Sequence, residues 1–301
     1  MNRQEIIAIG ASAGGVEALQ LLAAALPADL NAAVMIVLHI GAGINGHSYL
    51  PDILSKAGPL AALNPSDGEQ IRHGRIYIAP PDYHMQLQPG CLRLVHGPKE
   101  NHTRPAINPL FRSAAAAYGP RVTGVILTGA LDDGVAGLAE IKRRGGLAVV
   151  QDPSTAPFPS MPQNALERVH VDYISPILEM GGLLSKLSVM ERSAMENDEP
   201  IQRTHVKITC PECRGPLWEE RQGRIVEYRC RVGHAYSPLA MAQEHDDTVE
   251  RSLWSSVVAL EEAAEIAEKL APELGPKAVE SARQKRLRAA ALREMLNAHP
   301  R

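Results

Sequence analysis

The sequence lacks the features that mark membrane, secreted and nucleic-acid-binding proteins. No apolar run approaches the about 20 residues that a helix needs to cross a bilayer, and the N-terminus shows no signal-peptide pattern. The formal net charge is −3, so no overall positive charge draws the chain to nucleic acid or to a membrane surface. We therefore expect a cytoplasmic protein that does not bind nucleic acid.

Cysteine is scarce as well. Of the four cysteines, Cys91 stands alone and the other three cluster late in the chain. In a reducing compartment such a cluster indicates a metal site more than a disulfide. The length of 301 residues predicts a full α/β domain plus an appendage, because single cores usually stop growing near about 250–300 residues.

Short apolar segments alternate with helical patterns up to about residue 188. The apolar segments are rich in Val and Ile, as strands buried on both faces should be; they are Ile6–Ile9, Ala33–Leu38, Ile76–Ala79, Val122–Leu127 and Leu147–Val150. Helical spacing occurs at Val16–Leu26, Asn108–Tyr118, Gly134–Arg143 and Pro162–Val169. This alternation predicts a three-layer α/β/α fold with a mostly parallel sheet. We expect Cys91–Val95 in an exposed hairpin at a sheet edge.

Beyond this α/β domain, which we assign to residues 1–189, the composition changes three times. Residues 190–207 are polar and are expected to form a linker. Residues 208–237 hold the cysteine cluster and predict a small zinc-ribbon-like module. Residues 238–301 contain two helical stretches, the first acidic and the second basic. Opposite charge favours an antiparallel helical hairpin, with two unpaired solvated faces as the alternative.

The segment Gly10–Gly15 (GASAGG) lies between the first strand and the first helix. It matches G-x-S-x-G, in which a sharp turn presents the oxygen of Ser12 above the sheet. The following helix directs its free amides and positive dipole end at this point. An oxyanion formed by attack of Ser12 on a carbonyl would be stabilised there, with the Ala13 amide as first donor. Such a turn is equally typical of a dinucleotide-binding phosphate loop, so the motif alone leaves both interpretations open.

Polar side chains at two later strand ends favour the nucleophile. The second strand ends in His39, where a dinucleotide-binding fold would carry Asp or Glu. An imidazole there can take the serine proton and return it to the leaving group. The strand ending at Leu127 leads to Asp132 and Asp133; one can orient the imidazole while the other caps the following helix. Because the carboxyl ends of parallel strands share one edge, we expect these side chains beside Ser12.

Six motifs in a fixed order resemble the catalytic domain of the chemotaxis receptor protein-glutamate methylesterase family (CheB). They are GASAGG at Gly10–Gly15, VLH at Val37–His39, APPDYHM at Ala79–Met85, RPAINPLFRSAA at Arg104–Ala115, LTGALDDG at Leu127–Gly134 and MPQNA at Met161–Ala165. The resemblance covers residues 5–185 and implies a Ser12–His39–Asp133 catalytic triad. It favours Asp133 over Asp132 because the family's catalytic Asp directly precedes the glycine.

The resemblance also implies the reaction and its setting. The substrates would be glutamate γ-methyl esters on helical, methyl-accepting chemoreceptors, with glutamine deamidation as a second activity. Catalysis would need no cofactor, and contact with the membrane-bound receptors would be peripheral.

The chain departs from the family pattern at three points. Ala130 stands where many members have a methionine that lines the active site, and Ala13 stands where some have threonine. Since a backbone amide can serve at either position, we expect activity to survive with an altered substrate fit. The best-known members begin with a phosphorylatable receiver domain, whereas this sequence starts at the catalytic strand, so we expect no control by phosphorylation in cis.

The late cysteines have the spacing of a metal site. A C-x2-C pair is followed after 16 residues by C-x3-H, and two such pairs suit tetrahedral zinc in a structural role. The predicted ligands are Cys210, Cys213, Cys230 and His234, with His205 or His245 as alternatives to His234. Reduced thiols in a small apolar cluster remain the competing interpretation. The whole segment resembles the tail of stand-alone methylesterase homologues, most recognisably in CRVGHAYS at Cys230–Ser237, and we expect this module to dock a receptor or partner.

Three functions are therefore compared. The leading hypothesis is ester hydrolysis through an acyl-Ser12 intermediate, with His39 as the base in both half-reactions. A non-catalytic adaptor would keep the fold and bind receptors through the zinc and helical segments. A nucleotide-binding oxidoreductase would bind NAD tightly.

Overall fold

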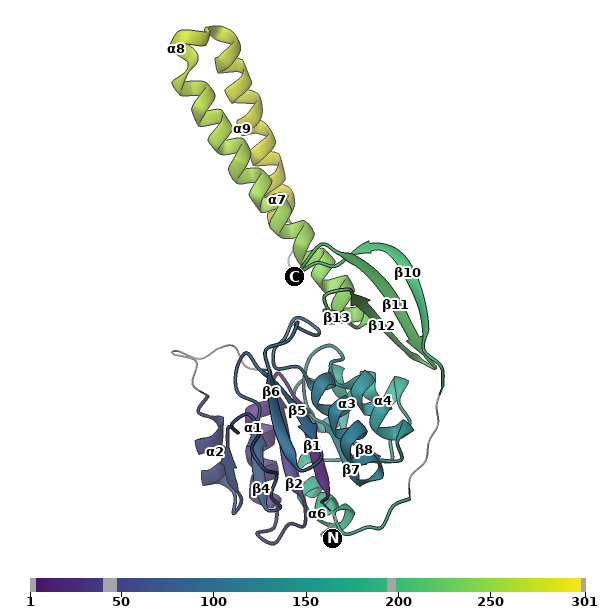
Figure 1. The fold of residues 1–301 in the computed structure, drawn as a ribbon. Helices are drawn as coiled ribbons and strands as arrows, with labels where there is room; N and C mark the ends of the chain where they lie inside the picture. The colour runs from purple at the N-terminus through teal and green to yellow at the C-terminus, as the bar shows by residue number, and fades with distance from the viewer. Residues whose placement is uncertain (1–3, 40–47, 194–198, 299–301) are drawn as a thin grey trace. The chain divides into compact units, whose positions relative to one another are not determined.

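The computed structural model describes residues 4–39, 48–193 and 199–298 (Figure 1). The chain divides into two compact units, Met1–Met241 and Ala242–Arg301. Among the described residues, no helix combines the length and the apolar character that crossing a membrane requires.

A seven-stranded sheet forms the centre of the first unit, in the order β3-β4-β2-β1-β7-β8-β9. All neighbouring strands are parallel. The strands are β1 (Ile6–Ala11), β2 (Ala33–Leu38), β3 (Ala61–Leu63), β4 (Arg75–Ile78), β7 (Val122–Ile126), β8 (Leu147–Gln151) and β9 (Tyr173–Ser175). The predicted parallel sheet is confirmed, and its central strands are buried on both faces, which explains their Val- and Ile-rich sequences.

Helices cover both faces of this sheet (Figure 1). One face packs against α1 (Gly15–Ala25), α2 (Leu50–Ala57) and α6 (Ile177–Leu187), and the other against α3 (Ile107–Tyr118), α4 (Val135–Arg143) and α5 (Ser160–Arg168). Short 3-10 helices occupy Gly119–Arg121 and Pro153–Thr155. The predicted three-layer fold is thus confirmed. The sequence patterns missed β3 and β9, which have three residues each and are too short to show a period.

The strands β5 (His84–Gln88) and β6 (Cys91–Val95) form the expected hairpin. It is a separate two-stranded sheet rather than an edge of the main sheet, so that part of the prediction is wrong. The hairpin buries Met85, Leu87 and Leu92 in the same apolar cluster as α3. Packing against a helix therefore takes the place of pairing with an edge strand.

The chain reverses its direction of winding at β1. From β1 it proceeds through β2 towards β4 and β3, and it then returns to the other side of β1 as β7, β8 and β9. In open α/β sheets, the crevice outside the carboxyl ends at such a reversal is where ligands bind. The residues that follow β1, β2 and β7 include Ser12, His39 and Asp133.

A four-stranded antiparallel sheet follows, made of β10 (Gln202–Thr209), β11 (Pro216–Gln222), β12 (Ile225–Cys230) and β13 (Ala235–Tyr236). We call residues 202–237 the Cys/His module. Residues 202–207, expected to be linker, belong to β10. This edge strand is mostly exposed, so it lacks the apolar alternation by which a strand is recognised. The module also belongs to the same compact unit as the α/β domain, instead of standing apart from it.

The second unit is formed by α7 (Pro238–Lys269), which begins in the first unit, α8 (Ala271–Leu274) and α9 (Pro276–Asn297). Ion pairs join Glu261 to Arg293 at 2.9 Å and Glu268 to Arg286 at 2.6 Å. The later residue on α7, Glu268, pairs with the earlier residue on α9, Arg286. The two helices therefore run antiparallel. The expected hairpin is therefore present, with acidic side chains of one helix paired with basic side chains of the other.

Candidate active site

Ser12 occupies a tight turn between β1 and α1. Its amide donates to the Thr128 carbonyl at 3.0 Å, and its carbonyl accepts from the Gly15 amide at 2.8 Å. Gly14, which caps α1, has a left-handed backbone with φ of 70° that side chains disfavour. A Cβ at Gly10 would lie 2.5 Å from Ile107. The small residues of the motif are thus required by the turn and by its packing on α3.

The loop after β7 holds this turn from the other side. The Thr128 hydroxyl donates to the Ala13 carbonyl at 3.0 Å and accepts from the Phe158 amide at 2.9 Å. At Gly129 the loop packs so closely that an added Cβ would lie 2.9 Å from the Cβ of Ser12 and 2.8 Å from Met161 Cε. The position of the serine is therefore set by long-range contacts as well as by its own motif.

His39 lies between Ser12 and Asp133. Its Nδ1 is 3.3 Å from Ser12 Oγ, and its Nε2 is 2.9 Å from Asp133 Oδ2. A carboxylate can only accept, so Nε2 carries the hydrogen and Nδ1 presents its lone pair to the hydroxyl. The side chain is 13% exposed. This arrangement can remove a proton from Ser12 and hold the resulting imidazolium against a carboxylate.

The carboxylate of Asp133 is buried and has several further donors. It accepts from the Ile107 amide at 2.6 Å, the Asn108 amide at 3.4 Å and the Asn101 side-chain nitrogen at 3.0 Å. Burial acts to raise the pKa of Asp133, but the hydrogen bonds from His39, Ile107 and Asn101 outweigh it and hold the pKa below its usual range. Asp133 is therefore a buried carboxylate whose charged form is stabilised by hydrogen bonds to both of its oxygens.

Asp132 points to a different set of partners. It pairs with Arg168 at 2.6 Å and accepts from the hydroxyl of Ser237. Burial raises the pKa of Asp132, although Ser237 and Arg168 act in the opposite direction. The expectation that one of the two carboxylates caps α4 is wrong, because the cap of α4 is Gly134 without a side-chain bond. Asp133 instead binds the first amides of α3, a helix that only the tertiary fold brings to it.

Of the two alanines expected near the reacting carbonyl, Ala13 directly follows the nucleophile, and Ala130 follows the loop residue Gly129 that packs against it. Within the described part of the chain, no acceptor takes the hydrogen of the Ala13 amide, so this donor is available at the start of α1. Ala130 is exposed and follows Gly129, where an added Cβ would lie 2.9 Å from the Cβ of Ser12. Methionine at position 130 would place a longer side chain on this exposed loop than alanine does.

Sequence reasoning overlooked Asn101, Thr103 and Thr128. Thr103 Oγ1 lies 3.4 Å from His39 Nε2, and Asn101 holds Asp133. Thr128 lies inside the LTGALDDG motif, so a signal for it was present. Asn101 and Thr103 precede the RPAINPLFRSAA motif in a loop of polar residues, where no local pattern distinguishes them.

The second cluster of chemistry-bearing side chains is in the Cys/His module. The ligand atoms of Cys210, Cys213, Cys230 and His234 all lie within 4.8 Å of one another. Cys213 Sγ is 3.7 Å from Cys230 Sγ, and His234 Nδ1 is 3.7 Å from Cys210 Sγ and 3.5 Å from Cys230 Sγ. A tetrahedral Zn²⁺ with Zn–S of about 2.3 Å and Zn–N of about 2.0 Å requires about 3.8 Å between sulfurs and about 3.6 Å between sulfur and nitrogen. The donor set therefore fits zinc in type and in spacing.

The alternative fourth ligands do not join this cluster. The His205 ring packs edge-on against Trp218, with 5.7 Å between centroids. His245 is likewise absent from the group of ligand atoms that the described residues bring together.

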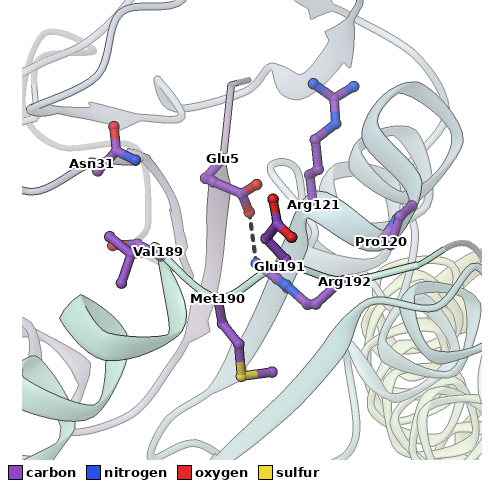
Figure 2. A pocket seen from close by; sticks show the side chains of 9 residues that line it. Glu5, Asn31, Pro120, Arg121, Val189, Met190, Glu191 and Arg192 are labelled. Carbon is purple, nitrogen blue, oxygen red and sulfur yellow. Dashed lines mark hydrogen bonds and ion pairs between the residues drawn. The ribbon is translucent and has the colours of Figure 1, made fainter. Parts of the chain in front are cut away.

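A pocket of about 350 Å³ lies at the opposite, amino-terminal edge of the main sheet (Figure 2). The ion pair between Arg192 and Glu5, at 2.6 Å, crosses it. Its one hydroxyl side chain, Ser188, donates to the Ser185 carbonyl, and no histidine is among the described residues that line the pocket. This pocket offers no activated nucleophile, and the candidate active site remains at the carboxyl edge.

Comparison with known proteins agrees with this assignment. The family model described as CheB methylesterase matches residues 7–184. A protein of Leptospira interrogans named "Putative protein-glutamate methylesterase/protein-glutamine glutaminase" is 39% identical over 184 residues, which cover 61% of this chain and 94% of the relative. A Methanosarcina mazei protein named "Protein-glutamate methylesterase/protein-glutamine glutaminase 2" is 36% identical over 61% of this chain, which spans 52% of that relative.

A solved structure also matches the α/β domain. The crystal structure of the Thermotoga maritima CheB methylesterase catalytic domain superimposes with a TM-score of 0.58 at 31% identity, covering 61% of this chain and 98% of that one. The dinucleotide-binding alternative has no comparable support, since His39 occupies the position of the ribose-binding acid. The chain belongs to the CheB methylesterase family.

Proposed function

We propose that the protein is a protein-glutamate methylesterase that uses Ser12, His39 and Asp133 as a catalytic triad. The observation that carries the proposal is the hydrogen-bonded series from Ser12 Oγ through both nitrogens of His39 to the buried Asp133 carboxylate. A serine hydroxyl is a weak nucleophile by itself, and an oriented base in contact with it is the feature that activates it. Family membership supports the same reaction.

The proposed acylation step follows from this geometry. Ser12 Oγ attacks the γ-carbonyl carbon of the glutamyl methyl ester, and its proton passes to His39 Nδ1. The oxyanion that forms accepts the Ala13 amide hydrogen at the positive end of α1. The tetrahedral intermediate then breaks its bond to the methoxy oxygen, which takes the proton from His39 and leaves as methanol.

Deacylation repeats the sequence with water. His39 removes a proton from water as the water oxygen attacks the acyl-Ser12 carbonyl. The intermediate expels Ser12 Oγ, which recovers its proton and leaves the free glutamate side chain. Asp133 keeps the imidazole in one orientation and stabilises its protonated form in both steps.

Glutamine deamidation is proposed as the second activity, in line with the names of the relatives. The same acyl-enzyme forms when ammonia replaces methanol as the leaving group. Proton donation by His39 is then essential, because an amide nitrogen cannot leave as an anion.

The proposed substrate is a methylated helix of a chemoreceptor. Phe158 is 48% exposed and reaches the elbow, since a Cβ at Gly14 would lie 3.2 Å from its ring. An exposed aromatic side chain beside a nucleophile suits contact with an apolar stripe of a helix. We place the reaction in the cytoplasm, where free thiols such as those of this chain persist.

The proposal is tested by methanol release from a methylated chemoreceptor. Ser12→Ala and His39→Ala should each lower the rate by about 10³-fold or more, because the triad acts as a unit. Ser256→Ala serves as the matched control, since Ser256 is an exposed residue of α7 that bonds only within its helix. Equal methanol release from the wild type and Ser12→Ala would overturn the proposed nucleophile.

We further propose that the Cys/His cluster holds one structural zinc ion. Four protein donors fill a tetrahedron and leave no position for substrate, so the ion would stabilise the module without taking part in hydrolysis. Elemental analysis should find one zinc per chain in the wild type, and Cys213→Ala should release it. A metal-free wild type with intact β10–β13 would contradict this assignment.

A further inference from the structure

Asn101 connects the Cys/His module to the buried carboxylate of the candidate triad. Its side-chain nitrogen donates to Asp133 Oδ1 at 3.0 Å, and its side-chain oxygen accepts from the Ser237 amide at 2.8 Å. Asn101 is buried, with 6% of its surface exposed. One amide group thus touches the Asp133 carboxylate with one end and the module with the other.

The backbone of the module also forms a hydrogen bond with the backbone of Asn101. The Asn101 amide donates to the Ala235 carbonyl at 2.8 Å, and Glu100 forms a parallel bridge with Ala235. Asn101 has a left-handed backbone with φ of 47°, which asparagine tolerates better than most residues. With its backbone held in this way, the side chain of Asn101 points towards Asp133.

Neighbouring contacts hold the two surfaces together. The Ser237 hydroxyl donates to Asp132 and accepts from the Ala240 amide. The His102 ring packs against Tyr236, with 5.2 Å between centroids, and bonds to the Ala240 carbonyl at 3.0 Å. The module and the first turn of α7 therefore contact the loop of residues 100–103 through both polar and apolar groups.

The two residues that form hydrogen bonds with Asn101, Ala235 and Ser237, lie just after His234, the last of the four predicted metal ligands. Ala235, Tyr236 and Ser237 come immediately after His234, whose carbonyl accepts from the Cys230 amide at 3.0 Å. The Tyr236 hydroxyl lies 3.6 Å from Cys210 Sγ. Anything that orders the four-ligand cluster therefore orders the segment that holds Asn101.

We propose that the Cys/His module is a positioning element for Asp133, acting through Ser237 and Asn101, and that its metal content sets the geometry of the Asp133–His39 pair. The catalytic consequence rests on the proposed triad, whereas the structural consequence does not. Without Asn101, one oxygen of a buried carboxylate loses its best-directed donor, and the remaining weak bond to the Asn108 amide at 3.4 Å does not fix it. A misplaced carboxylate orients the imidazole poorly, and small displacements at such positions cost about 100-fold in rate.

The first test replaces Asn101 by glycine, which accepts the left-handed backbone and removes only the side chain. Asn64→Gly is the control, because Asn64 likewise donates a side-chain hydrogen bond, to the Ile78 carbonyl at 2.9 Å, and makes no contact with Asp133 among the described residues. We expect Asn101→Gly to lower kcat by about 10- to 100-fold with little change in KM for the receptor. A rise in KM with unchanged kcat would show instead that the module serves only to dock the receptor, and would overturn the proposal.

The second test removes zinc from the full-length protein with a chelator and then restores it. The readout is the NMR signal of the His39 Nε2 hydrogen, assigned by its loss in His39→Ala. We expect this signal to weaken or shift on zinc removal and to return with zinc, in step with the rate at which a fluorophosphonate labels Ser12. An unchanged His39 signal in the zinc-free protein would overturn the proposal.

The two measurements separate this inference from the proposed function. If wild-type Ser12 does not react with the fluorophosphonate, the proposed triad fails, and the NMR signal still decides whether the module positions Asp133. If Ser12 reacts equally fast with and without zinc while the NMR signal is constant, the triad stands and the positioning role fails.

Discussion

At the scale of single residues, Gly129 packs directly against the candidate nucleophile. A Cβ there would lie 2.9 Å from the Cβ of Ser12, an atom fixed to the backbone of its turn, so the turn itself would have to shift. We expect Gly129→Ala to displace Ser12 and to lower the rate of fluorophosphonate labelling by about 100-fold, as for other displacements of reacting groups. Retention of the far-UV circular dichroism spectrum would separate this effect from unfolding.

Gly182→Ala is the control for that change. Gly182 lies in α6, and a methyl group added to it would have no neighbouring atom within 4 Å. Alanine should increase the free energy of unfolding by about 0.5–1 kcal/mol, as expected inside a helix, and leave labelling of Ser12 unchanged. Equal labelling rates for both glycine variants would contradict the steric role of Gly129.

The adjacent carboxylates Asp132 and Asp133 should respond to pH with opposite sign. Hydrogen bonds hold the pKa of Asp133 below its usual range, so its stabilising contribution is present above about pH 4 and is lost as the pH falls through the folded-state pKa. Burial raises the pKa of Asp132, so the folded state binds this proton more readily than the unfolded state does. The contribution of Asp132 to the free energy of unfolding therefore grows as the pH falls.

The measurement is the free energy of unfolding of the wild type relative to Asp133→Asn and to Asp132→Asn across the acidic range. On acidification, the free energy of unfolding of the wild type should fall relative to that of Asp133→Asn. Relative to that of Asp132→Asn, it should rise. The same trend for both variants would contradict the assigned difference between the two environments.

At the scale of elements, the helical hairpin depends on its buried alanines more than on its ion pairs. The pairs Glu261–Arg293 and Glu268–Arg286 are exposed, and such pairs contribute about 0–1 kcal/mol each. Ala282 is 1% exposed, so a charged side chain there would be buried without a partner. We expect Ala282→Glu to unfold the hairpin and Glu268→Lys to leave it folded.

Thermal melting followed by circular dichroism distinguishes these outcomes, with Ala290→Glu as the control at an exposed position of α9. A larger loss of stability from Glu268→Lys than from Ala282→Glu would show that electrostatic pairing holds the hairpin.

At the scale of the whole first unit, Arg112 joins the α/β domain to the Cys/His module. It extends from α3 to Glu100 and to Glu227 of β12, the latter at 3.3 Å. Among the described residues, its removal leaves the two largely buried carboxylates with only the longer pairs to Arg229, at 3.9 Å from Glu100 and 3.6 Å from Glu227. We expect Arg112→Met to cost about 2–3 kcal/mol of unfolding free energy, somewhat less than for a fully buried pair because Arg112 is 28% exposed.

The measurement is denaturant unfolding together with limited proteolysis of residues 199–201, which lead into the module. Arg203→Met is the control, since Arg203 makes an exposed pair with Glu220 within the module. Equal destabilisation by both variants would indicate that the contact between the module and α3 contributes no more than a surface pair.

Much of the α/β domain was predictable because its signals are local. Buried parallel strands show as Val- and Ile-rich segments, and β2 coincides with the predicted Ala33–Leu38. The linker was partly mispredicted because β10 is an exposed edge strand whose register comes from β11. Asn101 was missed because a buried asparagine in a loop has the same local sequence as an exposed one.

The sequence by itself determined the parallel sheet, the serine elbow, the histidine at the next strand end and the spacing of the four metal ligands. Each follows from a local period or a short motif, and parallel strands must bring their carboxyl ends to one edge. The family resemblance favoured Asp133 as the partner of His39, but only the tertiary structure decided that Asp133 binds the first amides of α3 and that Asn101 links Asp133 to Ser237. These contacts join residues that lie 26 to 136 positions apart, and no local pattern encodes the packing that brings them together.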